Sequence, residues 1–129
     1  MWMRLNKPDV AKEVANEVDP GESRVLSHLI KELSYRSWAK EVSAVISVQK
    51  LRLTSAASWK QENTAGTVFL SVDSEGLVAA EYCPAKSNIT TACIKRRPED
   101  APDAVELLIW HMLSEDNHLA NVDEETDPS

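Results

Sequence analysis

The sequence predicts a single α+β domain over residues 1–120, in which N-terminal helices pack on an antiparallel sheet of three or four strands. Three observations support this prediction. Apolar residues recur at helical spacing as far as Leu33, residues 67–95 alternate between apolar and polar side chains around turn residues, and an apolar helical segment follows from Ala104 to Leu113. Helices that are separated from strands along the chain favour this class over an alternating parallel fold, and the last helix is expected to close the domain.

Two helices are expected before residue 34. The first runs from Pro8 to Val18, with Asn6 as its cap, and the second begins near Glu22. The second has apolar residues at positions i, i+3, i+4 and i+7 of a helix, which are Val25, Leu26, Leu29, Ile30 and Leu33. Between the two helices the sequence Asp-Pro-Gly at 19–21 predicts a break.

Residues 36–58 allow two interpretations. Polar residues from Arg36 to Ser58 recur at steps of three and four, which indicates a helix with one polar face. Residues 45–54 also alternate and are rich in β-branched side chains, which favours a strand. We predict a helix as far as Ala44, a strand over 45–54, and a polar loop from Ser55 to Gly66 that contains Trp59.

A hairpin is predicted from Thr67 to Cys83. Asp73-Ser74-Glu75-Gly76 has the residues of a type I turn, and it places Asp73 opposite Leu77. The resulting register pairs Val72 with Val78, Leu70 with Ala80 and Val68 with Tyr82.

A third strand over 89–95 would place Cys93 opposite Ala79 and not opposite Cys83. A disulfide bond between the two cysteines would then need another register. Both cysteines are therefore predicted to be reduced, partly buried thiols, as unpaired cysteines in proteins commonly are.

The C-terminal helix is expected to begin after Asp100, which can cap it. Between Ala104 and Leu113 only Glu106 and His111 interrupt the apolar residues. A helix that is apolar almost all round must be covered on every side, so we predict a homodimer formed through residues 103–113. Residues 121–129 are acidic, contain one apolar residue, and are expected to form a disordered tail.

Composition excludes several functions. Twenty-one acidic residues against fourteen basic ones give a net charge of −7, so a nucleic-acid partner is not expected. Three glycines leave no phosphate-binding loop, and no Gly-x-Ser-x-Gly sequence marks a hydrolase nucleophile. With no signal-peptide pattern and no long apolar run, we expect a cytoplasmic protein that has no membrane partner.

Three residues are candidates for a binding site: Trp59, because it lies in a polar loop, and the neighbours Trp110 and His111. His111, Glu115 and His118 have the spacing of metal ligands on one helix face, but one helix supplies at most three, so neither metal nor cofactor is expected. The leading expectation is a non-enzymatic protein- or peptide-binding module, such as an inhibitor, an immunity-type protein or a chaperone-like adaptor. The alternative is a small-ligand protein or enzyme with a pocket near Trp59, Trp110 and His111.

Overall fold

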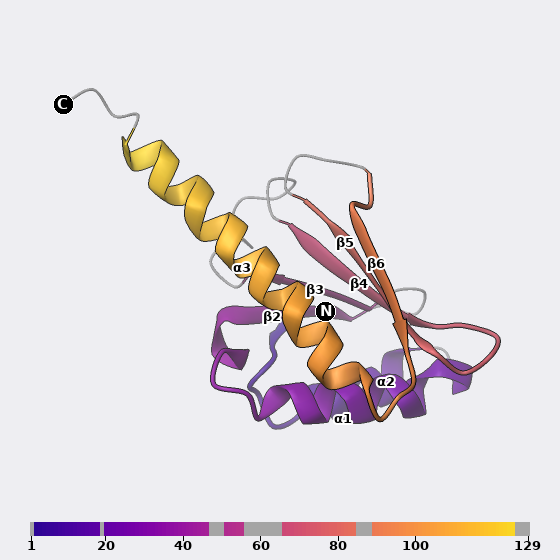
Figure 1. Ribbon diagram of the computed structural model, residues 1–129. Coiled ribbons are helices and arrows are strands. Elements are labelled where there is room, and N and C mark those ends of the chain that lie inside the picture. The colour runs from indigo at the N-terminus through magenta and orange to yellow at the C-terminus, as the bar shows by residue number, and fades with distance from the viewer. Residues whose placement is uncertain (1, 19, 47–50, 56–65, 85–88, 126–129) are drawn as a thin grey trace.

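The computed structural model describes residues 2–18, 20–46, 51–55, 66–84 and 89–125, and for Trp2, Pro20 and residues 115–125 it describes the backbone alone. In these residues the fold is α+β, with three α-helices and a six-stranded antiparallel sheet (Figure 1). The helices are α1 (Val10–Glu17), α2 (Pro20–Ser34) and α3 (Ala101–Glu125), and a 3₁₀ turn, η1, covers Ala39–Glu41. The strands are β1 (Trp2–Arg4), β2 (Val42–Ile46), β3 (Leu51–Ser55), β4 (Thr67–Val72), β5 (Val78–Cys83) and β6 (Ala92–Arg96).

The strands lie in the sheet in the same order as in the chain, β1 to β6. Successive side chains of a strand point to opposite faces, so the register assigns each residue to one face. The row Ala44, Leu53, Val68 and Tyr82 belongs to the inner face, against which all three helices pack. Figure 1 shows α1 and α2 side by side below the sheet, with α3 crossing the same side.

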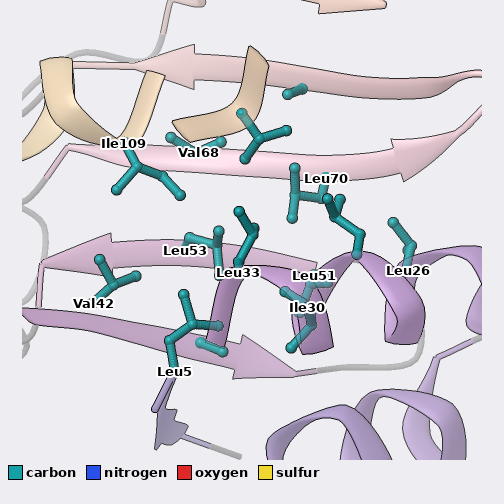
Figure 2. Packing of buried hydrophobic residues seen from close by; sticks show 14 of the residues in the cluster. Leu5, Leu26, Ile30, Leu33, Val42, Leu51, Leu53, Val68, Leu70 and Ile109 are labelled. Atoms are coloured by element: carbon teal, nitrogen blue, oxygen red, sulfur yellow. The ribbon is translucent and has the colours of Figure 1, made fainter. Parts of the chain in front are cut away.

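The buried core is formed by this inner face together with one apolar stripe of each helix. Helix α2 contributes the stripe that the sequence predicts, including Leu26, Ile30 and Leu33, and α3 contributes Ile109. Figure 2 shows these side chains with Leu51, Leu53, Val68 and Leu70 of the sheet. Leu5, just after β1, is fully buried, and its backbone N–H donates to the carbonyl of Val42 at 2.8 Å.

The expected sheet of three or four strands is corrected to six. Strand β1 was not expected, because three residues are too few to show an alternating pattern. The single strand predicted over 45–54 is instead two strands, β2 and β3, which pair with each other.

The helix predicted as far as Ala44 is also wrong, because α2 ends at Ser34 and β2 begins at Val42. All five residues of β2 are buried, on both faces of the sheet. A strand that is buried on both faces has no alternation of apolar and polar residues, so periodicity does not distinguish it from a helix.

The predicted hairpin is confirmed, and its register is the one that the turn residues imply. Val72 pairs with Val78, Leu70 with Ala80 and Val68 with Tyr82. Gly76 has φ of 82°, a conformation that glycine adopts without strain, and its N–H donates to the carbonyl of Asp73.

The third strand of this part of the sheet begins later than expected, at Ala92. Its register is also shifted by two residues, so Cys93 lies opposite Glu81 and not opposite Ala79. The backbone N–H of Thr91, just before β6, donates to the carbonyl of Tyr82.

Helix α3 continues past the predicted domain end at residue 120 and reaches Glu125. Its last turns extend beyond the sheet and away from the rest of the molecule (Figure 1). Residues 126–129 lie outside the described residues, so the disordered tail stays a prediction. Within the described residues, no helix combines the length and the apolar content that a bilayer-crossing segment needs.

Candidate functional site

The outer face of α3 carries the two predicted site residues that the structure describes, Trp110 and His111. Both side chains are exposed, and that of Trp110 retains 50% of its accessible surface. Trp59 lies outside the described residues, so its predicted position beside them is untested.

Leu107 belongs to the same surface. It is 71% exposed, and it precedes Trp110 by three residues, which places the two side chains side by side on one face of the helix. Asp103 and Ser114 lie on the same face, and both are exposed. We call Asp103, Leu107, Trp110 and Ser114 the outer stripe of α3.

The opposite face of α3 explains why the outer stripe points to solvent. Ala101, Val105, Ile109 and Met112 are almost completely buried against the sheet and α2. A helix can turn only one face to the sheet, so Leu107 and Trp110 are left outside. The sequence predicts this surplus, but it does not indicate which residues form it.

A polar network holds the start of α3 against the segment that follows α2. The Arg36 guanidinium lies 3.3 Å from Asp103 Oδ1 and 3.8 Å from Glu106 Oε2. Glu106 also accepts a hydrogen bond from the indole N–H of the buried Trp38. This network supports the orientation of α3 that the burial of Val105, Ile109 and Met112 already sets.

No pattern in the sequence indicates this network. The residues that it joins are 67 and 68 positions apart in the chain, so no local spacing signals their contact.

His111 borders a closely packed region beneath the helix. Its ring lies edge-on to Tyr82, with 5.1 Å between the ring centroids and 76° between the planes. Tyr82 is fully buried, and a Cβ added at Gly66 would lie only 3.0 Å from its hydroxyl oxygen. Tyr82 therefore fills the space beneath His111, where the alternative interpretation places a pocket.

Metal sites with three or more protein ligands are absent from the part of the chain that the structure describes. No group of three or more His, Cys, Asp or Glu residues there is arranged to hold a metal ion. Glu115 and His118, the predicted companions of His111, lie where only the backbone is described.

A second ion pair joins β6 to the turn between β4 and β5. Lys95 lies 3.5 Å from Asp73 across the sheet, and Asp103 pairs with Arg36. The carboxylate of Asp73 accepts hydrogen bonds from the backbone N–H groups of Leu77 and Glu75. The bond from Leu77 is the main cause of a lowered pKa for Asp73; the bond from Glu75 and the Lys95 ammonium also lower it, and burial opposes them.

Comparison with family models, curated proteins and solved structures finds no significant match to this chain.

Proposed function

We propose that the protein is a non-enzymatic protein-binding module and that it pairs with a second copy of itself through the outer stripe of α3. The observation that carries this proposal is the exposure of Leu107 and Trp110 side by side on a helix whose other face is buried. Tryptophan is among the residues that contribute most to protein interfaces, and adjacent exposed apolar residues are a common feature of contact surfaces.

Arg36 reduces the negative charge beside the stripe, which matters for a second copy because the net charge is −7. Asp103 and Glu106, which precede Leu107 and Trp110 along the helix, share the Arg36 guanidinium of the same chain. This guanidinium offsets one of the two negative charges, and the remaining acidic surplus would favour basic partners elsewhere on the molecule.

The stripe also suits a two-fold arrangement. When two copies of one helix face each other in opposite directions, each residue meets a different residue of the partner, and the contact occurs twice. An axis between Leu107 and Trp110 places each Leu107 against the tryptophan of the second copy. It also places the Asp103 carboxylate near the Ser114 hydroxyl, which can donate to it.

Sedimentation velocity of the unmodified protein and of Leu107→Glu and Trp110→Glu tests the proposal. The unmodified chain should be dimeric at tens of micromolar, about the range of a moderate dimer, and each variant should be monomeric. Glu32→Gln, at an exposed position of α2, is the control and should remain dimeric. A monomeric unmodified chain would contradict the dimer, and folding of each variant is checked by circular dichroism.

The alternative function, a pocket for a small ligand, receives less support from the described residues. Trp110 and His111 lie at the surface, and Tyr82 occupies the space beneath His111. We therefore favour the binding module.

A further inference from the structure

We infer that Cys83 and Cys93 together form a two-thiolate site for a soft metal ion of the Cu(I) type. Both residues are thiols in the structure. The site lies on the outer face of the sheet, opposite to the face that the helices cover, and it is independent of the surface on α3.

The register brings the two thiols to neighbouring positions. Cys93 lies directly opposite Glu81, and Cys83 follows Glu81 by two residues on the same strand. Their inner neighbours Tyr82, Ala92 and Ile94 belong to or pack against the core, so Cys83 and Cys93 both point to the outer face. The two cysteines are therefore diagonal neighbours on the last two strands of the sheet.

The spacing of diagonal neighbours favours a bridging ion over a disulfide bond. Their Cα atoms lie about 7–8 Å apart in an antiparallel pair, whereas a disulfide bond needs at most about 6.8 Å. Two metal–sulfur bonds of about 2.3 Å separate the sulfur atoms by about 4.6 Å, more than twice the length of an S–S bond. An ion with two ligands therefore spans a gap that is too wide for direct oxidation.

The exposure of the two cysteines and the preference of thiolates for soft ions both favour Cu(I) binding. Cys93 is exposed and Cys83 is half-buried, so an ion can reach both sulfur atoms. The thiol of Cys83 lies 3.7 Å from the carbonyl oxygen of Ile89, a weak contact that a metal–sulfur bond would replace. Thiolates select soft ions such as Cu(I), and a pair of ligands suits an ion that accepts two-coordinate geometry.

The binding step releases protons and involves no oxidation. Two thiols and one Cu(I) ion give a bis-thiolate complex with one negative charge, and two protons leave to solvent. Glu81, opposite Cys93, would repel this added charge, while Lys95 on the same face would attract it. Glu81 thus influences the affinity without being a ligand.

Anaerobic titration of the full chain with Cu(I), against a chromophoric Cu(I) chelator and with native mass spectrometry, tests the site. One ion per chain is expected, and Cys83→Ser or Cys93→Ser should each weaken binding at least about 100-fold, because the second ligand is then lost from the same chain. Glu81→Gln is the matched control and should bind as tightly as the unmodified protein or slightly more tightly.

Three results would overturn the inference. The first is binding by either single-cysteine variant within threefold of the unmodified protein. The second is an ion found only between two chains, in a species that Leu107→Glu does not abolish. The third is a mass loss of two daltons after mild oxidation of the folded protein, which would show that the sulfur atoms already lie close enough for a disulfide bond.

Discussion

Asp73 holds the turn between β4 and β5 with its side chain as well as its backbone. Its Oδ1 accepts hydrogen bonds from the N–H groups of Glu75 at 2.9 Å and Leu77 at 3.0 Å. Aspartate was expected at the first position of this turn, and these bonds are the physical reason for that preference. They also lower the pKa of the Asp73 carboxyl, the bond from Leu77 most of all.

The lowered pKa of Asp73 makes the turn's contribution to stability depend on pH. Because the folded protein favours the ionised carboxyl, this contribution is fully present above the unfolded value of about 3.9 and is lost as the pH falls through the lower folded value. Asp73→Asn keeps an oxygen that can accept both backbone bonds but removes the charge. We expect the free energy of unfolding of this variant to depend less on pH below about 4 than that of the unmodified protein.

Urea unfolding at pH values between about 2.5 and 7 measures this difference, over the range in which a carboxyl with a lowered pKa titrates. Asp73→Ala removes the charge and the acceptor together, so it should be less stable than Asp73→Asn at neutral pH. Parallel curves for Asp73→Asn and the unmodified protein would show that Asp73 does not cause the pH dependence.

Glu106 is the residue on which the buried indole of Trp38 depends. Replacing it by alanine leaves the indole N–H without its acceptor, and an unsatisfied buried donor costs about 1–3 kcal/mol. Glu106→Gln retains an acceptor and should lose less of the free energy of unfolding than Glu106→Ala.

Asp103→Ala is the control for Glu106, since Asp103 contacts the same Arg36 from a side chain that is 88% exposed. Exposed ion pairs contribute at most about 1 kcal/mol, so this variant should remain close to the unmodified protein in urea unfolding. If Asp103→Ala and Glu106→Ala lowered the free energy of unfolding equally, the effect would come from the lost contact with Arg36 and not from the unpaired indole N–H.

Among the helices and strands, the sequence predicted most reliably those features that depend only on residues close together in the chain. The register of the β4–β5 hairpin was predicted correctly because one turn fixes it. Strand β1 was missed because it is short and its partner β2 follows only after two helices, and β2 was missed because its residues show no alternation of apolar and polar side chains. The candidate site followed the same rule: the surplus of apolar residues on α3 was visible, but which of them stay exposed depends on how α3 packs against the distant sheet and α2.

Substitutions at Leu107 and Ile109 compare the exposed and the buried face of α3. Ile109 is fully buried and Leu107 is largely exposed. We expect Ile109→Ala to lower the free energy of unfolding by about 2–5 kcal/mol, since it leaves a cavity in the core. Leu107→Ala should change that free energy by less than about 0.5 kcal/mol when measured at a concentration low enough to keep the chain monomeric.

These two values are obtained from the same urea experiment. A large loss for Leu107→Ala at low concentration would mean that Leu107 packs within its own chain and is not available to a partner.

The last residues of α3 and those that follow it are expected to contribute little to stability. Residues 121–129 carry four carboxylates, and the last turn of α3 has no basic residue to balance the negative end of its dipole. Ordering this segment costs about 1–2 kcal/mol per residue, and its single apolar side chain offsets little of that cost. Deleting 121–129 should therefore leave the melting temperature within about two degrees of the unmodified value, equivalent to about half of 1 kcal/mol.

Differential scanning fluorimetry measures this change at one fixed protein concentration. A clear drop in the melting temperature would instead show that the segment packs against the domain or against a second copy.

At the scale of the whole molecule, pairing through α3 makes stability depend on protein concentration. For a chain that folds as a dimer, each tenfold rise in concentration adds about 1.4 kcal/mol to the apparent stability. The melting temperature of the unmodified protein should therefore rise with concentration, while that of Leu107→Glu should stay constant. Calorimetry over two decades of concentration makes the comparison, and a constant value for both proteins would contradict the proposed dimer.

The order of strands in the sheet also has a consequence for synthesis on the ribosome. Five strands follow one another from β2 to β6, so each can pair with its neighbour soon after it is made. Strand β1 differs, because two helices are made between it and its partner β2, whose register joins Met3 to Ala44. During that interval α1 and α2, which contact each other, can assemble in the nascent chain, while Leu5 stays exposed until Val42 has been made. The burial of Leu5 therefore depends on a segment that is made only after both helices.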